Sequence, residues 1–245
     1  ATDSIPSNPL QLNSTFIVMK TLLQTALLLA GVALATLDSG AATRTWSGAG
    51  ADNLWSNAAN WSNGIPVDGD SVLLLRRPLV SFVSAVNDLT NLSLASIRCE
   101  ALGYDLSGGA LRLTGEVLLG GPAVGASLSL SAPLEIPGPT LQIVSTNSSE
   151  LNLSGVVTAP ASAVVTIEGG IRFNVSSASD YRAETRLRSG FMTLLSTRIS
   201  GPLVIGGDGA NFATVILQSG NLFGNFPPLT ILTNGRVNNI STFQS

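Results

Sequence analysis

The sequence predicts an all-β protein built as a parallel β-helix, a solenoid in which each coil stacks on the one before it. Short segments alternate apolar and polar residues, as strands with one buried face do. Glycine-containing turns separate these segments. The same turn-and-strand form returns at Gly109, Gly170, Gly190 and Gly235, at steps of 61, 20 and 45 residues. These steps are near multiples of roughly 20–22 residues, a repeat length typical of solenoids.

A β-sandwich or jelly roll is the alternative fold, because its turns also recur, although at about 8–12 residues. The longer step favours the solenoid. The clearest strand places Ile171, Phe173 and Val175 on one face and Arg172 and Asn174 on the other. No such segment is long enough to form a core alone, whereas stacked copies could form one.

The start of the chain has the features of an export leader. Residues 1–18 are polar and turn-rich, and we expect them to be an upstream extension outside the mature protein. Residues 19–42 combine Lys20, an apolar run and small residues that fit cleavage at Ala33–Ala35 or at Gly40–Ala42. The apolar run is short for a membrane span of about 20 residues, which makes an uncleaved anchor the weaker alternative. We therefore expect an exported protein, periplasmic in transit and finally extracellular or at the cell surface.

The composition excludes several classes of function. Charged residues make up 11% of the chain and the net charge is −3, without a basic stripe, which argues against nucleic acid as a partner. The chain has no histidine and one cysteine, so a Cys–His nucleophile and an internal disulfide are excluded. We expect Cys99 to be a small buried hydrophobic residue. No catalytic, cofactor-binding or metal-binding residue is predicted.

The chain's three tryptophans all lie in the segment 43–71, which we expect to be an N-terminal cap. The first coil of a β-helix exposes its apolar interior and an unpaired edge, and bulky aromatic residues among turn residues could cover both. The alternative is a sugar-binding platform, for which Trp55 and Trp61 are the candidate ligand-binding residues. Asp68 and Asp70 could form a catalytic pair, but Asp-Gly is a turn signal, and we expect them to stabilise a turn.

The coils of the β-helix are expected to fill residues 72–245 and to be incomplete at the C-terminus. A helix over Leu89–Glu100 is a weak alternative within them. The six side chains expected to point inward are Leu111, Leu113, Ile171, Phe173, Val204 and Val215. The expected strands after the cap are 72–75, 79–83, 92–97, 111–113, 117–119, 127–130, 141–144, 151–153, 164–167, 203–205, 214–217, 229–232 and the region of Val237.

Residues 103–207 resemble the autotransporter-associated β-strand repeat of bacterial passenger proteins. The family's Gly-Gly-x-Leu strand, tyrosine loop, Thr-rich strand and Gly-x-Leu strand correspond here to Gly169–Phe173, Tyr181, Thr185–Leu187 and Gly190–Leu194. The tyrosine loop departs from the family, since it carries Arg, Ala and Glu in place of Thr and Gly pairs. The resemblance implies a right-handed parallel β-helix that is exported and then displayed or released.

The cap segment resembles the opening segment of many bacterial passenger-type proteins. The residues that carry this resemblance are Trp46, Gly48, Trp55, Asn60, Trp61, Pro66, Gly69, Asp70 and Val72. Both resemblances are more specific for a fold than for an activity.

The functional prediction is a non-enzymatic, secreted or surface-displayed β-helical protein of passenger or adhesin type. The alternatives are a carbohydrate-binding module that uses an exposed tryptophan, and a polysaccharide lyase or hydrolase. The lyase or hydrolase needs clustered carboxylates, whereas the glutamates are scattered one to a segment. Surface glycans or other copies of the chain are the expected partners. Contact with an outer membrane is expected only through a C-terminal anchor outside this sequence.

The arginines 182, 186 and 188 could form an anion site, but acidic residues lie among them, and we expect a solvated strand face. The turn Gly206–Gly209 is similar to the turns of calcium-binding β-rolls. A single copy is weak, since such turns share an ion between successive repeats, and a plain loop is expected.

Overall fold

The computed structural model describes residues 41–75, 82–121, 125–175, 181–194, 200–207, 212–217 and 228–239, all within a compact unit that spans residues 41–245. These residues form strands joined by turns, with one short 3-10 helix, η1, at Ala58–Asn60. The protein is therefore all-β. The strands are β1 Thr43–Trp46, β2 Trp61–Ser62, β3 Ser71–Leu74, β4 Val83–Asn87, β5 Leu92–Cys99, β6 Tyr104–Gly108, β7 Leu111–Leu119, β8 Ser127–Leu130, β9 Leu134–Glu135, β10 Thr140–Leu153, β11 Val157–Thr158, β12 Val164–Val175, β13 Glu184–Leu187, β14 Gly190–Leu194, β15 Leu203–Ile205, β16 Ala213–Leu217, β17 Leu229–Ile231 and β18 Gly235–Asn239.

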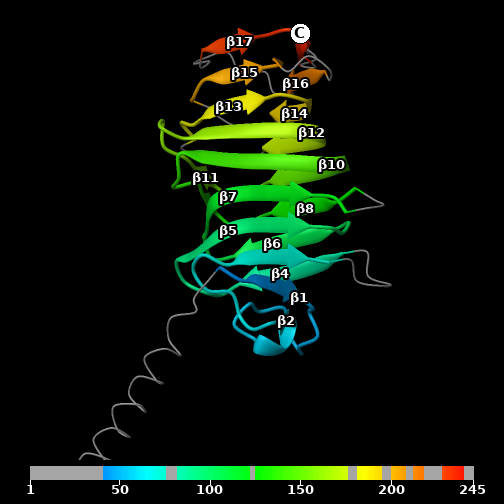
Figure 1. Ribbon diagram of the computed structural model, residues 1–245, viewed down its shortest axis with the longest axis vertical. Helices are drawn as coiled ribbons and strands as arrows, with labels where there is room; N and C mark the ends of the chain where they lie inside the picture. Colours follow the sequence, from blue (N-terminus) through cyan, green and yellow to red (C-terminus); the bar gives the residue numbers. More distant parts are fainter. Residues whose placement is uncertain are drawn as a thin grey trace, which may run out of the picture. The chain divides into compact units, whose positions relative to one another are not determined.

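Strands of successive coils stack in parallel on three faces (Figure 1). The first face runs from β1 through β3 and parts of β5, β7, β10 and β12 to β13, β15 and β17. The second face runs from β4 through β6, β8 and parts of β10 and β12 to β14, β16 and β18. The third face contains the first parts of β5 and β7, followed by β9 and β11. This parallel pairing confirms the β-solenoid and rules out the antiparallel sandwich or jelly roll.

The core is built from rows of side chains that stack one coil above another. On the first face, register alignment places a buried aliphatic residue at the same position of seven successive coils. These residues are Val72, Ile97, Val117, Ile143, Ile167, Leu187 and Ile205. An internal cavity of about 10 Å³ lies among the apolar side chains. This cavity has no more than the space of one water molecule, so the side chains that line it are closely packed.

Five of the six side chains expected to point inward are buried, and Val204 is the exception. Leu203 and Ile205 point inward instead, and Val204 is aligned with the outward Arg186 of the coil before. The helix considered over Leu89–Glu100 is also wrong, because β5 occupies most of it.

The strand prediction also differs from the structure in other places. The strand β4 begins at Val83, where the expected strand 79–83 ends, and residues 79–81 lie outside the described ones. The sequence prediction missed β6, in which buried Tyr104 and Leu106 alternate with outward Asp105.

Gly190 and Gly235, two of the recurring glycines, lie where one coil closely approaches the next. Gly190 is aligned with Ala213 and then with Gly235, so this step of 45 residues spans two coils. Gly190 has a positive φ of 92°. A Cβ added there would lie 2.7 Å from the carbonyl oxygen of Ile171 in the preceding coil. Only glycine combines this backbone conformation with so close an approach.

Candidate functional site

The cap, defined here as Thr43–Asp70, covers the open edges of the first coil. On the first face, β2 pairs antiparallel with β1, and Trp46 lies opposite Trp61. On the second face, the Trp55 N–H donates to the Val86 carbonyl over 2.9 Å and the Val86 N–H donates to the Asn53 carbonyl over 2.8 Å. Both contacts use backbone groups that an uncapped first coil would expose.

The three indoles form one buried cluster under these strands. Their exposed fractions are 1% for Trp46, 0% for Trp55 and 6% for Trp61. Trp61 packs edge-to-face on both neighbours, with ring centroids 4.9 Å from Trp46 and 5.3 Å from Trp55. The Trp61 Nε1–H also donates to the Trp55 carbonyl over 2.8 Å. Sugar stacking at Trp55 or Trp61 requires an exposed indole face, and the packing in this structure leaves neither ring with one.

A fully buried asparagine holds the loop between the tryptophans in place. The Asn60 amide nitrogen donates to the backbone carbonyls of Asp52 and Leu54, each over 3.0 Å. The Asn60 amide oxygen accepts from the Gly50 N–H over 2.8 Å. All of these partners are backbone groups of the loop, so Asn60 replaces the hydrogen bonds that a strand or helix would supply.

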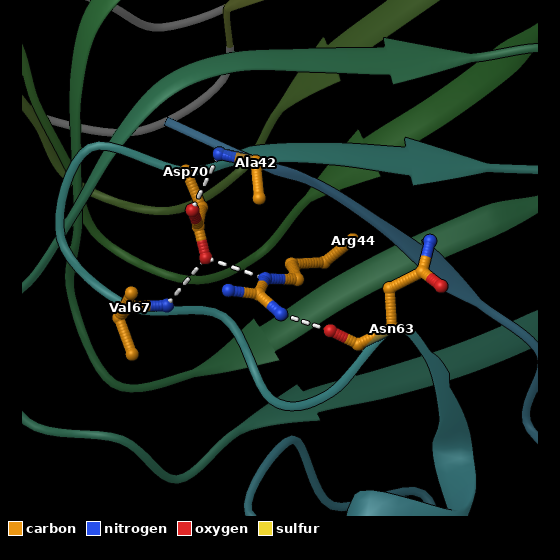
Figure 2. A network of polar contacts seen from close by, with 5 residues as sticks. All are labelled: Ala42, Arg44, Asn63, Val67 and Asp70. Carbon is orange, nitrogen blue, oxygen red and sulfur yellow. Dashed lines mark hydrogen bonds and ion pairs between the residues drawn. The ribbon is translucent and has the colours of Figure 1, made fainter. Parts of the chain in front are cut away.

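Asp70 is the centre of a second polar network, at the junction of cap and coils (Figure 2). Its side chain is 2% exposed. Its Oδ1 accepts from the Ala42 N–H over 2.8 Å, and its Oδ2 accepts from Arg44 Nε over 2.7 Å and from the Val67 N–H over 3.0 Å. Arg44 also donates to the Asn63 carbonyl. A single carboxylate thus joins the start of β1 to the loop before β3.

These contacts determine the charge state of Asp70. Burial raises the pKa of the carboxyl group, but the hydrogen bonds from Val67, Ala42 and Arg44 and the charge of Arg44 outweigh burial and hold the pKa below its ordinary value of 3.8. Because the pKa of Asp70 is lower in the folded than in the unfolded protein, the ionised carboxylate stabilises the fold at any pH above the unfolded-state pKa. That stabilisation is lost as the pH falls through the folded pKa.

We therefore expect Asp70→Asn to lower the free energy of unfolding at pH 7 by about 1–3 kcal/mol, because buried donors lose a charged acceptor. The deficit should shrink as the pH falls from the ordinary aspartate pKa through the lower pKa of folded Asp70, since the wild-type carboxylate then becomes protonated as well. Urea denaturation of both proteins across a pH series measures this. The matched control is Asp68→Asn, and an equal, pH-independent loss in the two variants would contradict the role of Asp70.

Asp68 and Asp70 accept hydrogen bonds from separate sets of partners. Asp68 Oδ1 accepts from the Ser93 N–H over 2.9 Å, while Asp70 binds the three donors of its own network. The backbone N–H of Asp70 also donates to the Val67 carbonyl over 3.0 Å, which closes the turn. Asp70 therefore has the expected turn role, whereas the side chain of Asp68 binds the backbone of a different strand.

Eight charged residues on the described coils form four separate ion pairs. The ion pairs along the coils are Arg98–Glu100, Arg112–Glu135, Arg186–Glu184 and Arg188–Glu168. Two of the arginines considered as an anion site are thus bound to glutamates, while Asp180 lies outside the described residues. Over the described ranges, no three of the residues Cys, Asp and Glu come together in a way that could hold a metal ion. Asp208 and Gly209 of the calcium-type turn also lie outside these ranges.

Cys99 is a buried core residue, as expected, and its exposed fraction is 0%. Burial raises the pKa of the thiol to about 11, which keeps it protonated at neutral pH. We expect the folded protein to resist alkylation by iodoacetamide at pH 7 and to react at one site after denaturation in urea. Mass spectrometry of the treated protein measures the uptake. Rapid alkylation without denaturant would show that the core around Cys99 is open.

A surface groove of about 450 Å³ lies across the later coils of the third face. Its polar lining comes from Glu135, Thr158 and Arg182, and its walls from Pro137 and Pro160. Among the described residues of this lining, Glu135 is the one carboxylate, and it is paired with Arg112. Glycoside hydrolysis commonly requires two carboxylates facing the scissile bond.

No family model, curated protein or solved structure matches this chain. In the part of the chain that the structure describes, no helix has the length and apolar character to cross a membrane. Most of the cap-segment residues singled out in the sequence are buried or adopt a positive φ. The tryptophans, Asn60, Pro66, Asp70 and Val72 are buried, and Gly48 and Gly69 adopt positive φ.

Proposed function

We propose that the chain is a non-enzymatic structural protein of bacterial passenger or adhesin type, exported and then secreted or displayed at the cell surface. The observation that carries this proposal is the outward row of the second face, which presents a small polar residue on five successive coils. The row consists of Ser84, Asp105, Ser129, Asn152 and Asn174, and in the next two coils it continues with the buried Thr193 and with Ile216. Such a repeated surface suits a spacer or an extended adhesive face, whereas catalysis requires different groups converging on one point.

The leader-like segment 19–42 supports export. Lys20, in this segment, is the only lysine in the sequence. The single cysteine, Cys99, is buried, so no thiol is exposed among the described residues. Surface glycans or further copies of the chain are the proposed partners.

Export is tested by producing the full chain with a C-terminal epitope in a Gram-negative host and fractionating the cells. We expect the epitope in the periplasm or the medium. Leu28→Arg should retain the chain in the cytoplasm, because a charge interrupts the apolar run. Val67→Arg, which places the same charge at an exposed cap position, should leave export unchanged. Cytoplasmic wild-type protein would contradict the proposal.

The non-enzymatic part is tested with the purified chain and a panel of neutral and acidic polysaccharides. We expect no new reducing ends and no unsaturated sugar products. If the chain degrades a polysaccharide and Glu135→Gln abolishes that activity, the chain has an enzymatic role at the groove and the proposed non-enzymatic role is wrong.

A further inference from the structure

Ala42 stands immediately before β1 and is built into the fold by both of its backbone groups. Its N–H donates to Asp70 Oδ1 over 2.8 Å, and its carbonyl accepts from the Ser71 N–H over 2.8 Å. The side chain that receives the N–H comes from 28 residues further along the chain. The fold therefore specifies where the nitrogen of Ala42 lies.

The acceptor at this position is suited to a positive charge. Asp70 is 2% exposed, and its Oδ1 faces the nitrogen of Ala42, while Oδ2 accepts from Arg44 and Val67. A carboxylate oxygen has two lone pairs, so Oδ1 can accept more than one hydrogen bond. An ammonium group at Ala42 would donate to it more strongly than a neutral amide does.

The sequence before Ala42 permits such a group to be formed. Ser39 and Ala41 place small residues at the third and the first position before the Ala41–Ala42 peptide bond, as the cleavage rule for export leaders requires. This bond lies one residue upstream of the cut at Gly40–Ala42 considered from the sequence. A cut after Ala42 would remove both of its hydrogen bonds, and a cut after Ala35 would leave a neutral amide facing Asp70.

We propose that the exported chain is cut between Ala41 and Ala42 and that Asp70 binds the new α-ammonium group. The proposal rests on the export proposed above. A signal-peptide-cleaving peptidase of the host adds water across the amide bond. Ala41 leaves as a carboxylate, and Ala42 keeps the nitrogen, which is protonated. Processing then replaces a neutral hydrogen bond at the junction of cap and coils by an ion pair.

The α-amine of the processed chain can be followed by its reaction with acylating reagents. Lys20 is the only lysine in the sequence and lies in the leader, so the processed chain has a single primary amine, the α-amine of its first residue. An amine held by a buried carboxylate reacts slowly with acylating reagents, because the reactive form is the free, unprotonated amine.

The test uses the full chain, exported with its own leader and purified through a C-terminal histidine tag. Intact mass and the N-terminal peptide give the first residue, which we expect to be Ala42. Acylation of the folded protein by an N-hydroxysuccinimide ester should be about tenfold or more slower than acylation in urea, as expected for a charge-assisted hydrogen bond. Asp70→Asn should remove most of this protection, and Asp68→Asn should keep it.

A first residue of Thr36 or Thr43 would overturn the proposed cut. A chain that begins at Ala42 but reacts equally fast folded and unfolded would overturn the binding of its amine by Asp70. Each of these results leaves export itself supported. An unprocessed chain in the cytoplasm contradicts export and, with it, this inference. The wild-type mass and acylation rates decide the outcome even if Asp70→Asn does not fold.

Discussion

Phe173→Ala should lower the free energy of unfolding by about 3–5 kcal/mol, the range for truncation of a buried phenylalanine. Phe173 is 3% exposed and stacks between Leu151 of the preceding coil and Met192 of the following one. The backbone ladders hold neighbouring coils about 4.8 Å apart, so they resist collapse into the space that the ring vacates. We therefore expect a loss in the upper part of the range, measured by urea denaturation of the purified chain.

Phe191→Ala is the matched control. Phe191 lies on the next coil of the same face but points outward and is 53% exposed. Its loss should change stability by no more than about 0.5 kcal/mol. Similar losses in the two variants would contradict the register of β12 and β14, in which Phe173 lies beside Met192 and Arg172 beside Phe191.

The contrast between Phe173 and Val204 shows what the sequence could predict about the core. Around Phe173, apolar and polar residues alternate, and the alternation alone determines which side is buried. Leu203, Val204 and Ile205 are all apolar, so no alternation identifies the inward pair. The register between coils determines which side chains point inward, because Val204 is aligned with the outward Arg186 of the preceding coil. Pairing between coils joins residues that are far apart in the sequence, so a local pattern of residues does not reveal it.

In the cap, too, the sequence predicted some features and the folded structure was needed for others. The spacing of aromatic and turn residues predicted a segment that covers the first coil, and it identified Asp70 as a turn residue. It did not predict that Asp70 would bind Ala42 and Arg44, which precede it by 28 and 26 residues. It also left Trp55 and Trp61 open as sugar-binding residues, since a sequence does not show whether an indole face meets solvent or a second indole. The folded geometry supplies that information.

Trp61→Ala should be the most damaging single change in the cap, with an expected loss of about 4–5 kcal/mol in the free energy of unfolding. Trp61 packs against both other indoles and donates to the Trp55 carbonyl, so its truncation removes two ring contacts and leaves a buried acceptor unpaired. Trp61 also belongs to β2, which covers the edge of β1. Loosening β2 exposes that edge, and exposed edges pair with other chains. Denaturation curves and sedimentation should therefore show a less stable and self-associating protein.

Conservative replacements separate the ring contacts from the hydrogen bond. Trp61→Phe keeps an aromatic ring and loses the Nε1–H bond to Trp55, at an expected cost of about 1–3 kcal/mol. The matched control is Trp46→Phe, because among the described residues the Trp46 Nε1–H is buried without a hydrogen-bond partner. Its removal costs no hydrogen bond, so Trp46→Phe should be the milder of the two. A Trp61→Ala protein that stays monomeric and loses less than about 1 kcal/mol would mean that the indole cluster does not hold the cap on the first coil.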